Sequence, residues 1–432
     1  MVSGPHQPDP PRRQRRSLTN VGGPIEVAGD AEDAKALAHA LDVAPADGGA
    51  PKGTTEDAED DAARAHVHGF HTYPARMHPQ TASRLVSALT PEGGTVLDPF
   101  CGSGTVLVEA MIAGRAGVGT DLNPLAVRLA RCKTRPRSPR ELAALVERAK
   151  EVAAFADDRR KGRAGATRRF WAEDVELFEP HVLLELDSIR AALEGPGDPV
   201  TGADLSLVLS SLLVKLSKKR GDTSEAVEKR RTAAGYTAKL FVKKTEDLAR
   251  RLATFTSLLP AGASSRREPA RIELDDATAL RSLGADACVD AIVTSPPYAA
   301  TYDYVSHHAL RLRWLGLDAR PLDAGELGAR RRYSSLSPDD AREAWSDELA
   351  RFLARAAELL PAKGPLVLLM ADSAVGNVAL RADAIVASLA RGCGFIPAAR
   401  ASQARTHFHG PTRHAFRDQP RAEHALLLRR AA

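Results

Sequence analysis

The segment from Gly94 to Asp121 constrains the fold of this chain more than any other part of the sequence. The run Thr95-Val96-Leu97 leads into the turn Asp98-Pro99-Phe100-Cys101-Gly102-Ser103-Gly104-Thr105, and an apolar-periodic stretch and a second strand-like run, 116–120, follow. Glycines let the backbone turn into a helix and approach a ligand closely. The second run ends at Asp121, nineteen positions after Gly102, the spacing at which an acid reaches ribose hydroxyls. The pattern predicts a nucleoside-binding strand, turn, helix and strand. The turn lacks the third glycine of the dinucleotide fingerprint, which disfavours a pyrophosphate cofactor.

A second corner follows the buried run Ala291-Ile292-Val293, where the chain reads Thr294-Ser295-Pro296-Pro297-Tyr298. Two consecutive prolines lack N–H groups and fix φ, so a strand must stop here. In open α/β sheets, ligands bind at the carboxyl ends of the strands. A hydroxyl, free backbone carbonyls and a flat ring at that place are suited to gripping a planar amine. A Pro-Pro pair alone favours an ordinary strand end.

Composition sets the limits within which these corners act. The chain has 432 residues, 44% of them hydrophobic, and a formal net charge of +5, which allows a polyanionic partner without requiring one. The four cysteines are far apart and indicate free thiols in a reducing cytoplasm. The first residues are polar and rich in Pro and Arg, and no apolar run approaches membrane-spanning length, so we expect a cytoplasmic protein without a membrane partner.

The chain divides into three parts by pattern. Residues 1–66 are rich in Pro, Gly and charge, and predict a disordered tail. Strand-like and helix-like runs fill 67–135 and 266–432 and predict one α/β domain. Residues 136–265 instead predict amphipathic helices with basic loops, a helical insertion. The loop from Lys215 to Ser224 combines basic residues, hydroxyls and a glycine, which suits phosphate contact as well as it suits a solvated turn.

With both corners identified, the sequence resembles the S-adenosylmethionine-dependent amino methyltransferases of DNA. The turn 98–105 is similar to their cofactor motif, and 294–298 is similar to their catalytic motif, in the Ser-Pro-Pro-Tyr form associated with cytosine-N4 more than adenine-N6 enzymes. The segment 71–79 resembles the one that packs near the methionine part of the cofactor, and 275–277 the acidic turn near the adenine ring. The resemblance covers roughly 66–135 and 266–432, and it implies a Rossmann-like sheet with helices on both faces. The insertion departs from it and is a candidate target-recognition region.

The resemblance implies a role for each residue of the two corners. The catalytic residues are expected to be Ser295, Pro296, Pro297 and Tyr298. The expected cofactor-binding residues are Tyr73, Pro74, Asp98, Pro99, Phe100, Gly102, Gly104, Thr105, Asp121, Asn123 and Asp276; Asp275 is an equal candidate with Asp276. No metal is expected, because the histidines near 66–78 lack a carboxylate or cysteine at ligand spacing.

The implied function is site-specific methylation of an exocyclic amine, cytosine N4 in the first place, in duplex DNA from which the target base is flipped. Adenine-N6 methylation, an RNA or tRNA base as substrate, and a non-catalytic nucleic-acid-binding protein remain the alternatives. A restriction-modification setting with a nuclease partner is implied by the resemblance alone.

Overall fold

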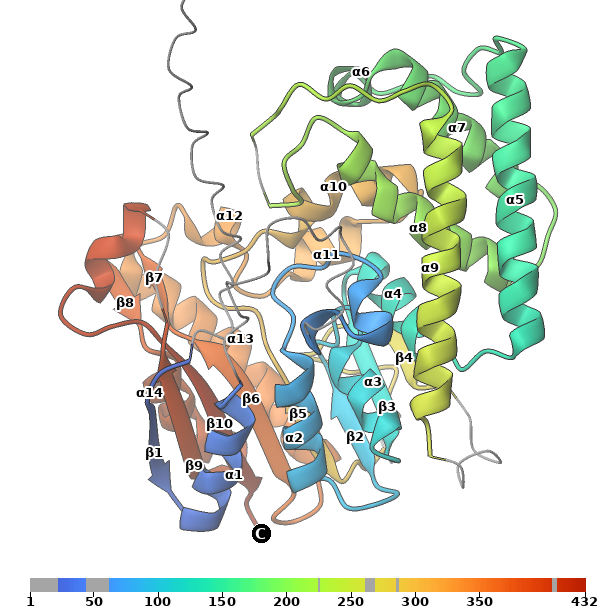
Figure 1. Ribbon diagram of the computed structural model, residues 1–432. Helices are drawn as coiled ribbons and strands as arrows, with labels where there is room; N and C mark the ends of the chain where they lie inside the picture. Colours follow the sequence, from blue (N-terminus) through green and yellow to red (C-terminus); the bar gives the residue numbers. More distant parts are fainter. Residues whose placement is uncertain (1–21, 44–61, 224–225, 261–268, 285–286, 406–409) are drawn as a thin grey trace, which may run out of the picture.

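The computed structural model describes residues 22–43, 62–223, 226–260, 269–284, 287–405 and 410–432 (Figure 1). Its centre is an eight-stranded sheet in the order β1-β9-β10-β6-β5-β2-β3-β4. The parallel strands are β2 (Thr95–Asp98), β3 (Ala116–Asp121), β4 (Arg271–Leu274), β5 (Ala291–Thr294) and β6 (Pro365–Ala371). At the other side lie β10 (Ala422–Arg430), antiparallel to β6, then β9 (Phe395–Ala404) and β1 (Ile25–Gly29). The predicted α/β fold is confirmed.

Helices cover both faces of the sheet, because alternate residues of the central strands face opposite sides. One face packs against α1 (Ala31–Leu41), α2 (Pro79–Leu89) and α3 (Thr105–Ile112), with α4 (Pro124–Thr134) beside them. The other packs against α13 (Pro338–Leu359) and α14 (Ala382–Ala390). The stripe Trp345, Leu349, Phe352 and Leu353 is fully buried on α13, as its helical spacing predicts.

Residues 22–43 correct the predicted tail. β1 pairs with β9 from Ile25↔Gln403 to Gly29↔Ala399, and α1 buries Leu37 against the sheet. The signal missed was a helix cap, since Asp30 accepts hydrogen bonds from the backbone of Glu32 and Asp33. The rest of the predicted tail, 1–21 and 44–61, lies outside the described residues; Ala62–Arg64 and His66–Gly69 form short 3₁₀ turns.

The insertion is helical, as its pattern predicts, and stands beside the sheet at the upper right of Figure 1. It contains α5 (Pro139–Lys161), α6 (Ala172–Leu177), α7 (Pro180–Leu193), α8 (Pro199–Leu216) and α9 (Tyr236–Leu258). These helices share a core with residues of α3, α4 and α10 (Tyr304–Trp314), so the insertion packs on the catalytic domain over a broad apolar contact.

Helix α8 is long and apolar enough to cross a membrane by length and composition, which the sequence analysis did not expect. Half of that stretch is buried inside the insertion, where it packs with α7 and α9. A core helix passes the same test, so this one helix is weak support for a membrane span.

The remaining elements are short, and all except the turn Arg391–Cys393, which precedes the start of β9 at the opposite edge, lie around the carboxyl ends of the parallel strands. They are the short helices α11 (Arg320–Gly325) and α12 (Arg330–Tyr333), the hairpin of β7 (Ser373–Val375) and β8 (Val378–Leu380), and the 3₁₀ turns Arg391–Cys393 and Gly410–Phe416.

The packing of α1 gives a first prediction. Leu37→Ala should lower the free energy of unfolding by about 2–5 kcal/mol, because it leaves a cavity beside the sheet. Lys35→Ala, at an exposed position of the same helix, is the matched control. Urea unfolding of both variants measures the difference; equal midpoints would mean that α1 does not pack on the sheet.

Candidate active site

The site forms where the direction of the chain connections reverses. β2 lies between β3 and β5; the chain leaves β2 for β3 on one side, and leaves β5 for β6 on the other. Such a reversal opens a crevice beyond the carboxyl ends of the two strands. β2 ends at Asp98 and β5 at Thr294, so the two sequence motifs meet there.

A hydrogen bond joins the two strand ends. The Thr294 hydroxyl donates to Asp98 Oδ1 at 2.6 Å, and the Phe100 amide donates to the same oxygen at 3.2 Å. Asp98 and Thr294 are both buried. Burial raises the pKa of Asp98 to about 7, against the opposing effect of these two donors.

The glycine turn is held by the acid that ends β3. Asp121 accepts from the Gly102 amide and from the Asn123 amide, each at 2.8 Å. Gly102 has φ of +50° and Gly104 has φ of +85°, and a Cβ on Gly104 would lie 3.0 Å from Ala130 Cα. Both positions therefore favour glycine. Burial raises the pKa of Asp121 to about 6. The carboxylate thus fixes the turn and still lines the crevice.

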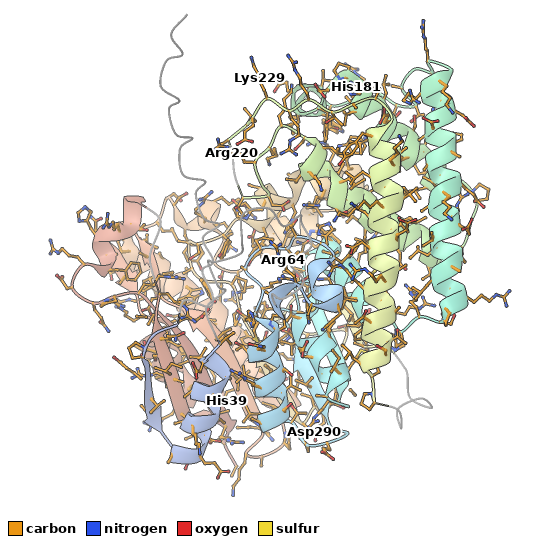
Figure 2. All side chains as sticks on the ribbon, in the orientation of Figure 1. His39, Arg64, His181, Arg220, Lys229 and Asp290 are labelled. Atoms are coloured by element: carbon orange, nitrogen blue, oxygen red, sulfur yellow. The ribbon has the colours of Figure 1, made fainter. Side chains whose placement is uncertain are left out.

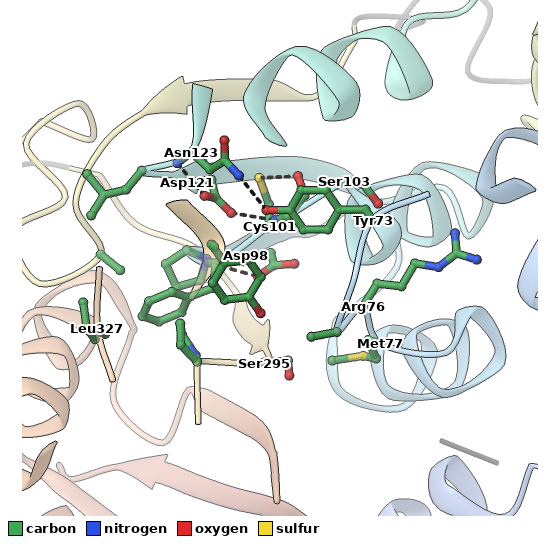
Figure 3. A pocket seen from close by; sticks show the side chains of 18 of the residues that line it. Tyr73, Arg76, Met77, Asp98, Cys101, Ser103, Asp121, Asn123, Ser295 and Leu327 are labelled. Carbon is green, nitrogen blue, oxygen red and sulfur yellow. Dashed lines mark hydrogen bonds between the residues drawn. The ribbon is translucent and has the colours of Figure 1, made fainter. Parts of the chain in front are cut away.

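An open cavity lies in this crevice, with about 810 Å³ of empty space that includes solvent at its mouth (Figure 3). Four carboxyl groups line it, and Arg76 is the one basic residue of its lining; the four are Asp98, Asp121, Asp275 and Glu326. Apolar and aromatic groups supply much of the remaining wall, among them Phe100, Tyr73 and Leu327. This acidic, partly apolar space fits a cationic nucleoside better than an anionic one.

Tyr73 is positioned by contacts on two sides. Its hydroxyl accepts from Asn123 Nδ2 at 3.2 Å, as Figure 3 shows. Its ring stacks on His308 with centroids 4.9 Å apart. The Tyr304 ring stacks on both, with centroids 6.4 Å from Tyr73 and 6.3 Å from His308. His308 is fully buried, and burial lowers its pKa to about 3, so it is a neutral packing partner here.

The proline corner presents one acceptor to both cavities, the Ser295 hydroxyl oxygen. The Ser295 hydroxyl donates to the Leu369 carbonyl at 2.9 Å, which commits its proton, and its oxygen, which also lies near the Tyr298 phenol, keeps acceptor capacity. No described residue donates to the carbonyl of Pro296. Behind the corner, Gly328 has φ of +60°, and a Cβ there would lie 3.1 Å from the Tyr298 carbonyl oxygen. The loop at Gly328 therefore supports the corner closely.

A second cavity, of about 1000 Å³, adjoins the first. The two share Ala75, Arg76, Met77 and Ser295 as lining residues. The second is also lined by Pro74, Thr223, Tyr298, Tyr302, Leu369, Arg421 and Glu423. Ser295 thus stands between an acidic cavity and a cavity walled by two tyrosines.

Most of the predicted site residues lie together. The first cavity is lined by Tyr73, Asp98, Pro99, Phe100, Gly102, Thr105, Asp121, Asn123, Ser295 and Pro297, and the second by Pro74, Ser295 and Tyr298. Three predicted residues line neither cavity. Gly104 supports the turn from behind, Pro296 lies buried beneath the corner, and Asp276 accepts from Thr278 within its own turn, whereas Asp275 lines the first cavity.

Sequence reasoning missed several residues of the lining. Tyr304, Glu326 and Leu327 reach the first cavity from α10 and the loop after α11, and Arg421 and Glu423 reach the second from the start of β10. Only Tyr304 had a signal in the sequence, since it follows the proline corner within an aromatic run. The others come from distant segments with no motif of their own.

Two groups of side chains have the spacing of metal ligands in the described part of the chain: His66, His68 and Glu109, and Asp372, Asp383 and His424. In the first, Glu109 supplies the carboxylate that sequence spacing did not reveal. Lys133 is fully buried close to it, and its charge opposes a cation there. In the second, Asp372 already accepts from Arg381, Ala382 and Ala422. No residue of either group lines the two cavities.

The basic loop after α8 lies at the same end of the molecule as the cavities. In Figure 2, Arg220 and Lys229 lie at the upper end of the molecule, and Asp290, which precedes β5, lies at the lower end. Lys218 Nζ donates to the Glu176 carbonyl at 2.6 Å, and Arg220 pairs with Glu228. Thr223, near the end of the loop, lines the second cavity. The predicted phosphate contact remains a prediction; the loop's position beside the second cavity is compatible with it.

Comparison with known proteins finds a family model and several relatives that are similar to part of the chain. Residues 50–131 match the family described as DNA methylase, N6_N4_Mtase. An 80-residue stretch is 42% identical to Type II methyltransferase M.MvaI of Kocuria varians and covers 18% of each chain. Over 287 residues the chain is 24% identical to Type II methyltransferase M.BsoBI of Geobacillus stearothermophilus, covering 59% of this chain and 54% of that one. A third relative, the tRNA (guanine(10)-N2)-dimethyltransferase of Methanothermobacter thermautotrophicus, is 40% identical over 62 residues, 14% of this chain and 18% of that one. The chain thus covers less than two thirds of the length of these relatives.

The burial of Asp98 predicts a pH dependence of stability. Its pKa of about 7 in the folded protein exceeds the ordinary value of 3.8, so the folded state holds the proton more tightly and stability falls as pH rises from about 4 to 7. Asp98→Asn removes this dependence. Between pH 5 and pH 8 the wild type should therefore lose about 2–3 kcal/mol relative to the variant, measured by urea unfolding without ligand.

Asp418→Asn, at an exposed carboxylate, is the control and should follow the wild type. Parallel pH profiles for wild type and Asp98→Asn would contradict the shifted pKa.

Proposed function

We propose that this chain, whose residues 50–131 match the DNA methylase family, transfers a methyl group from S-adenosylmethionine to an exocyclic amine of a base in DNA, cytosine N4 in the first place. The observation that carries the proposal is the pair of adjoining cavities that share Ser295. A methyl donor and a flipped base need two compartments that meet at the reacting atoms, and Ser295 stands at that meeting point.

The first cavity suits the donor. S-adenosylmethionine carries a sulfonium and an ammonium group, and its bound form supplies an electrophilic methyl group. Asp98, Asp121, Asp275 and Glu326 provide carboxyl groups along the cavity, and the glycine turn leaves room for close approach of the backbone. Asp121 lies at the end of β3, where an acid reaches ribose hydroxyls. Its bonds to Gly102 and Asn123 leave further lone pairs for such hydroxyls.

The proline corner suits the acceptor. A cytosine or adenine amine is a poor nucleophile, because its lone pair is delocalised into the ring. Ser295 Oγ and the Pro296 carbonyl can accept its two N–H bonds and favour a pyramidal nitrogen. As the N–C bond forms, the donor's S–C bond breaks and one amine proton is released to solvent. The fixed orientation of these acceptors lowers the barrier by positioning and by preorganised dipoles rather than through a strong base.

The aromatic residues of the second cavity suit a base taken out of its stack. Tyr298 and Tyr302 line that cavity, and burial raises the pKa of both phenols, so both stay neutral. A neutral ring face can stack on a base that has left the duplex, offsetting part of the few kcal/mol that flipping costs. The insertion closes one side of the same cavity through Thr223, which supports its role as a target-recognition region.

A methyl-transfer assay tests the proposal directly. Full-length protein, labelled S-adenosylmethionine and either unmethylated duplex DNA or unmodified tRNA are incubated together, and the modified nucleosides are identified by mass spectrometry. We expect label in DNA as N4-methylcytosine. N6-methyladenine would keep the DNA enzyme and change the base. Label in tRNA alone would favour the RNA substrate, to which one relative's name points. No label in either would support a non-catalytic binding protein.

Two variants should separate the cavities. Tyr298→Ala should lower kcat more than 100-fold and leave the Kd for S-adenosylmethionine unchanged, because the ring lines only the second cavity. Asp121→Ala should weaken cofactor binding about 10-fold or more, since it removes a charge and the anchor of the glycine turn. Titration calorimetry and the labelled assay measure the two effects. Retained activity in Tyr298→Ala, or unchanged affinity in Asp121→Ala, would sink the respective assignment.

A further inference from the structure

The second cavity contains a guanidinium group that the proposed chemistry does not use. Arg421 directly precedes β10 and is only 8% exposed. Its Nε donates to the Asp372 carbonyl at 2.8 Å, and no hydrogen bond or ion pair joins its terminal nitrogens to a residue that the structure describes. Because Arg421 lines the cavity, these terminal donors remain available to a ligand there.

The backbone around Arg421 is fixed on both sides. The Arg405 amide donates to the Arg421 carbonyl at 2.8 Å, and the next amide, of Ala422, donates to Asp372 Oδ2 at 3.0 Å. Together with the Nε contact, these bonds hold the guanidinium plane before any ligand arrives. A preorganised donor loses little conformational freedom on binding.

The neighbouring carboxylate has another partner. Glu423 also lines the cavity, and its Oε2 accepts from Arg405 Nε at 3.0 Å and from Arg405 Nη2 at 2.7 Å. Both bonds go to the same carboxylate oxygen, so Glu423 has a buried ion-pair partner other than Arg421. Among the described residues, Glu423 therefore pairs with Arg405 and not with Arg421.

The polar groups of the cavity differ in kind. Ser295 offers an acceptor, since its proton is committed to Leu369, and the Pro296 carbonyl of the same corner has no donor from the described residues. Arg421 offers only donors. Cytosine carries along one edge a donor amine at N4, followed by two acceptors, N3 and O2. Adenine carries its amine followed by one acceptor, N1, and then a C–H group.

We propose that Arg421 reads the target base: its terminal nitrogens donate to N3 and O2 of a flipped cytosine while the N4 amine lies at Ser295. A planar guanidinium meets two adjacent acceptors on cytosine and only one on adenine, so Arg421 selects cytosine. This inference rests on the proposed function and names its base-specificity residue. A good bidentate contact of this kind discriminates between bases by about 1–3 kcal/mol, which corresponds to roughly 5- to 150-fold in rate.

The test uses a substrate that lacks one acceptor. The recognition site is first found by sequencing plasmid DNA methylated by the full-length wild type. A duplex with that site then carries either cytosine or 3-deazacytosine, whose N3 is replaced by C–H, at the methylated position. The wild type, Arg421→Met and Arg421→Lys are compared by kcat/KM on both duplexes. The ratio of the two rates is taken within each protein, and the ratios are then compared between proteins. The intrinsic difference in reactivity between the two amines is the same in every protein, so it cancels in this comparison.

Arg381 provides a matched control, because it contacts the same aspartate as Arg421. Arg381 also binds Asp372, through its side chain at 2.8 Å, and lines neither cavity. Arg381→Lys should leave the cytosine to 3-deazacytosine ratio at the wild-type value. Arg421→Met should lower kcat/KM on cytosine by about 10- to 100-fold, lower its cytosine to 3-deazacytosine ratio at least 5-fold relative to wild type, and leave the Kd for S-adenosylmethionine unchanged. Arg421→Lys, which keeps the charge without the planar fork, should fall between them.

The outcomes distinguish this inference from the function on which it rests. A wild type that binds the cofactor and methylates no DNA would overturn the proposed function and the role of Arg421 with it. N6-methyladenine as the sole product, or an unchanged ratio in a folded Arg421 variant with normal cofactor affinity, would overturn the role of Arg421 alone.

Discussion

The hydrogen bond from the Thr294 hydroxyl to Asp98 is the contact on which the site depends. It joins the ends of two parallel strands that are adjacent in the sheet but almost two hundred residues apart in sequence. Without it, the buried Asp98 carboxylate would lose one of its hydrogen-bond donors, and its pKa would rise further. The bond also fixes where β5 ends, and so where Ser295 and the two prolines begin. The cofactor turn and the acceptor corner are thereby placed relative to each other by one short contact.

The distribution of charge between the two cavities gives the site a direction. The first is lined by four carboxyl groups, and the second by a phenol pair and the donors of Arg421. A cationic donor is favoured in the first and a neutral base with ring acceptors in the second. Arg76 and Met77 line both cavities, so they separate the acidic space from the aromatic one. The proposed cationic donor is favoured by the four carboxyl groups of the first cavity, whereas the second holds one carboxylate, Glu423, which pairs with Arg405.

The sequence predicted the parts of this site that follow from local pattern. The glycine turn, Asp121 and the Pro-Pro corner each combine a strand end with residues of special backbone geometry, and such features are visible in a few consecutive letters. Arg421 and Glu423 are not, because they enter the cavity through the antiparallel insertion of β10 between β6 and β9, which no local pattern encodes. Residues 22–43 were mistaken for a tail for a similar reason. A five-residue strand at a sheet edge has a weak signal, and its partner β9 lies at the other end of the chain.

The insertion is coupled to the site by a buried polar cluster centred on Arg311 of α10. Its guanidinium binds Asp222 of the loop after α8 at 2.7 Å, and its Nη2 donates to the Thr72 hydroxyl at 3.0 Å. Thr72 in turn donates to Asp222 at 2.8 Å and directly precedes Tyr73, which lines the first cavity.

Because Arg311 is 1% exposed, breaking this cluster would leave a buried charge without its partner, a cost of several kcal/mol. The loop that lines the second cavity and the tyrosine that lines the first are thus held by the same guanidinium. A displacement of the loop at Asp222 would therefore act on Thr72 and Tyr73, so the proposed target-recognition region and the proposed cofactor cavity are coupled through Arg311.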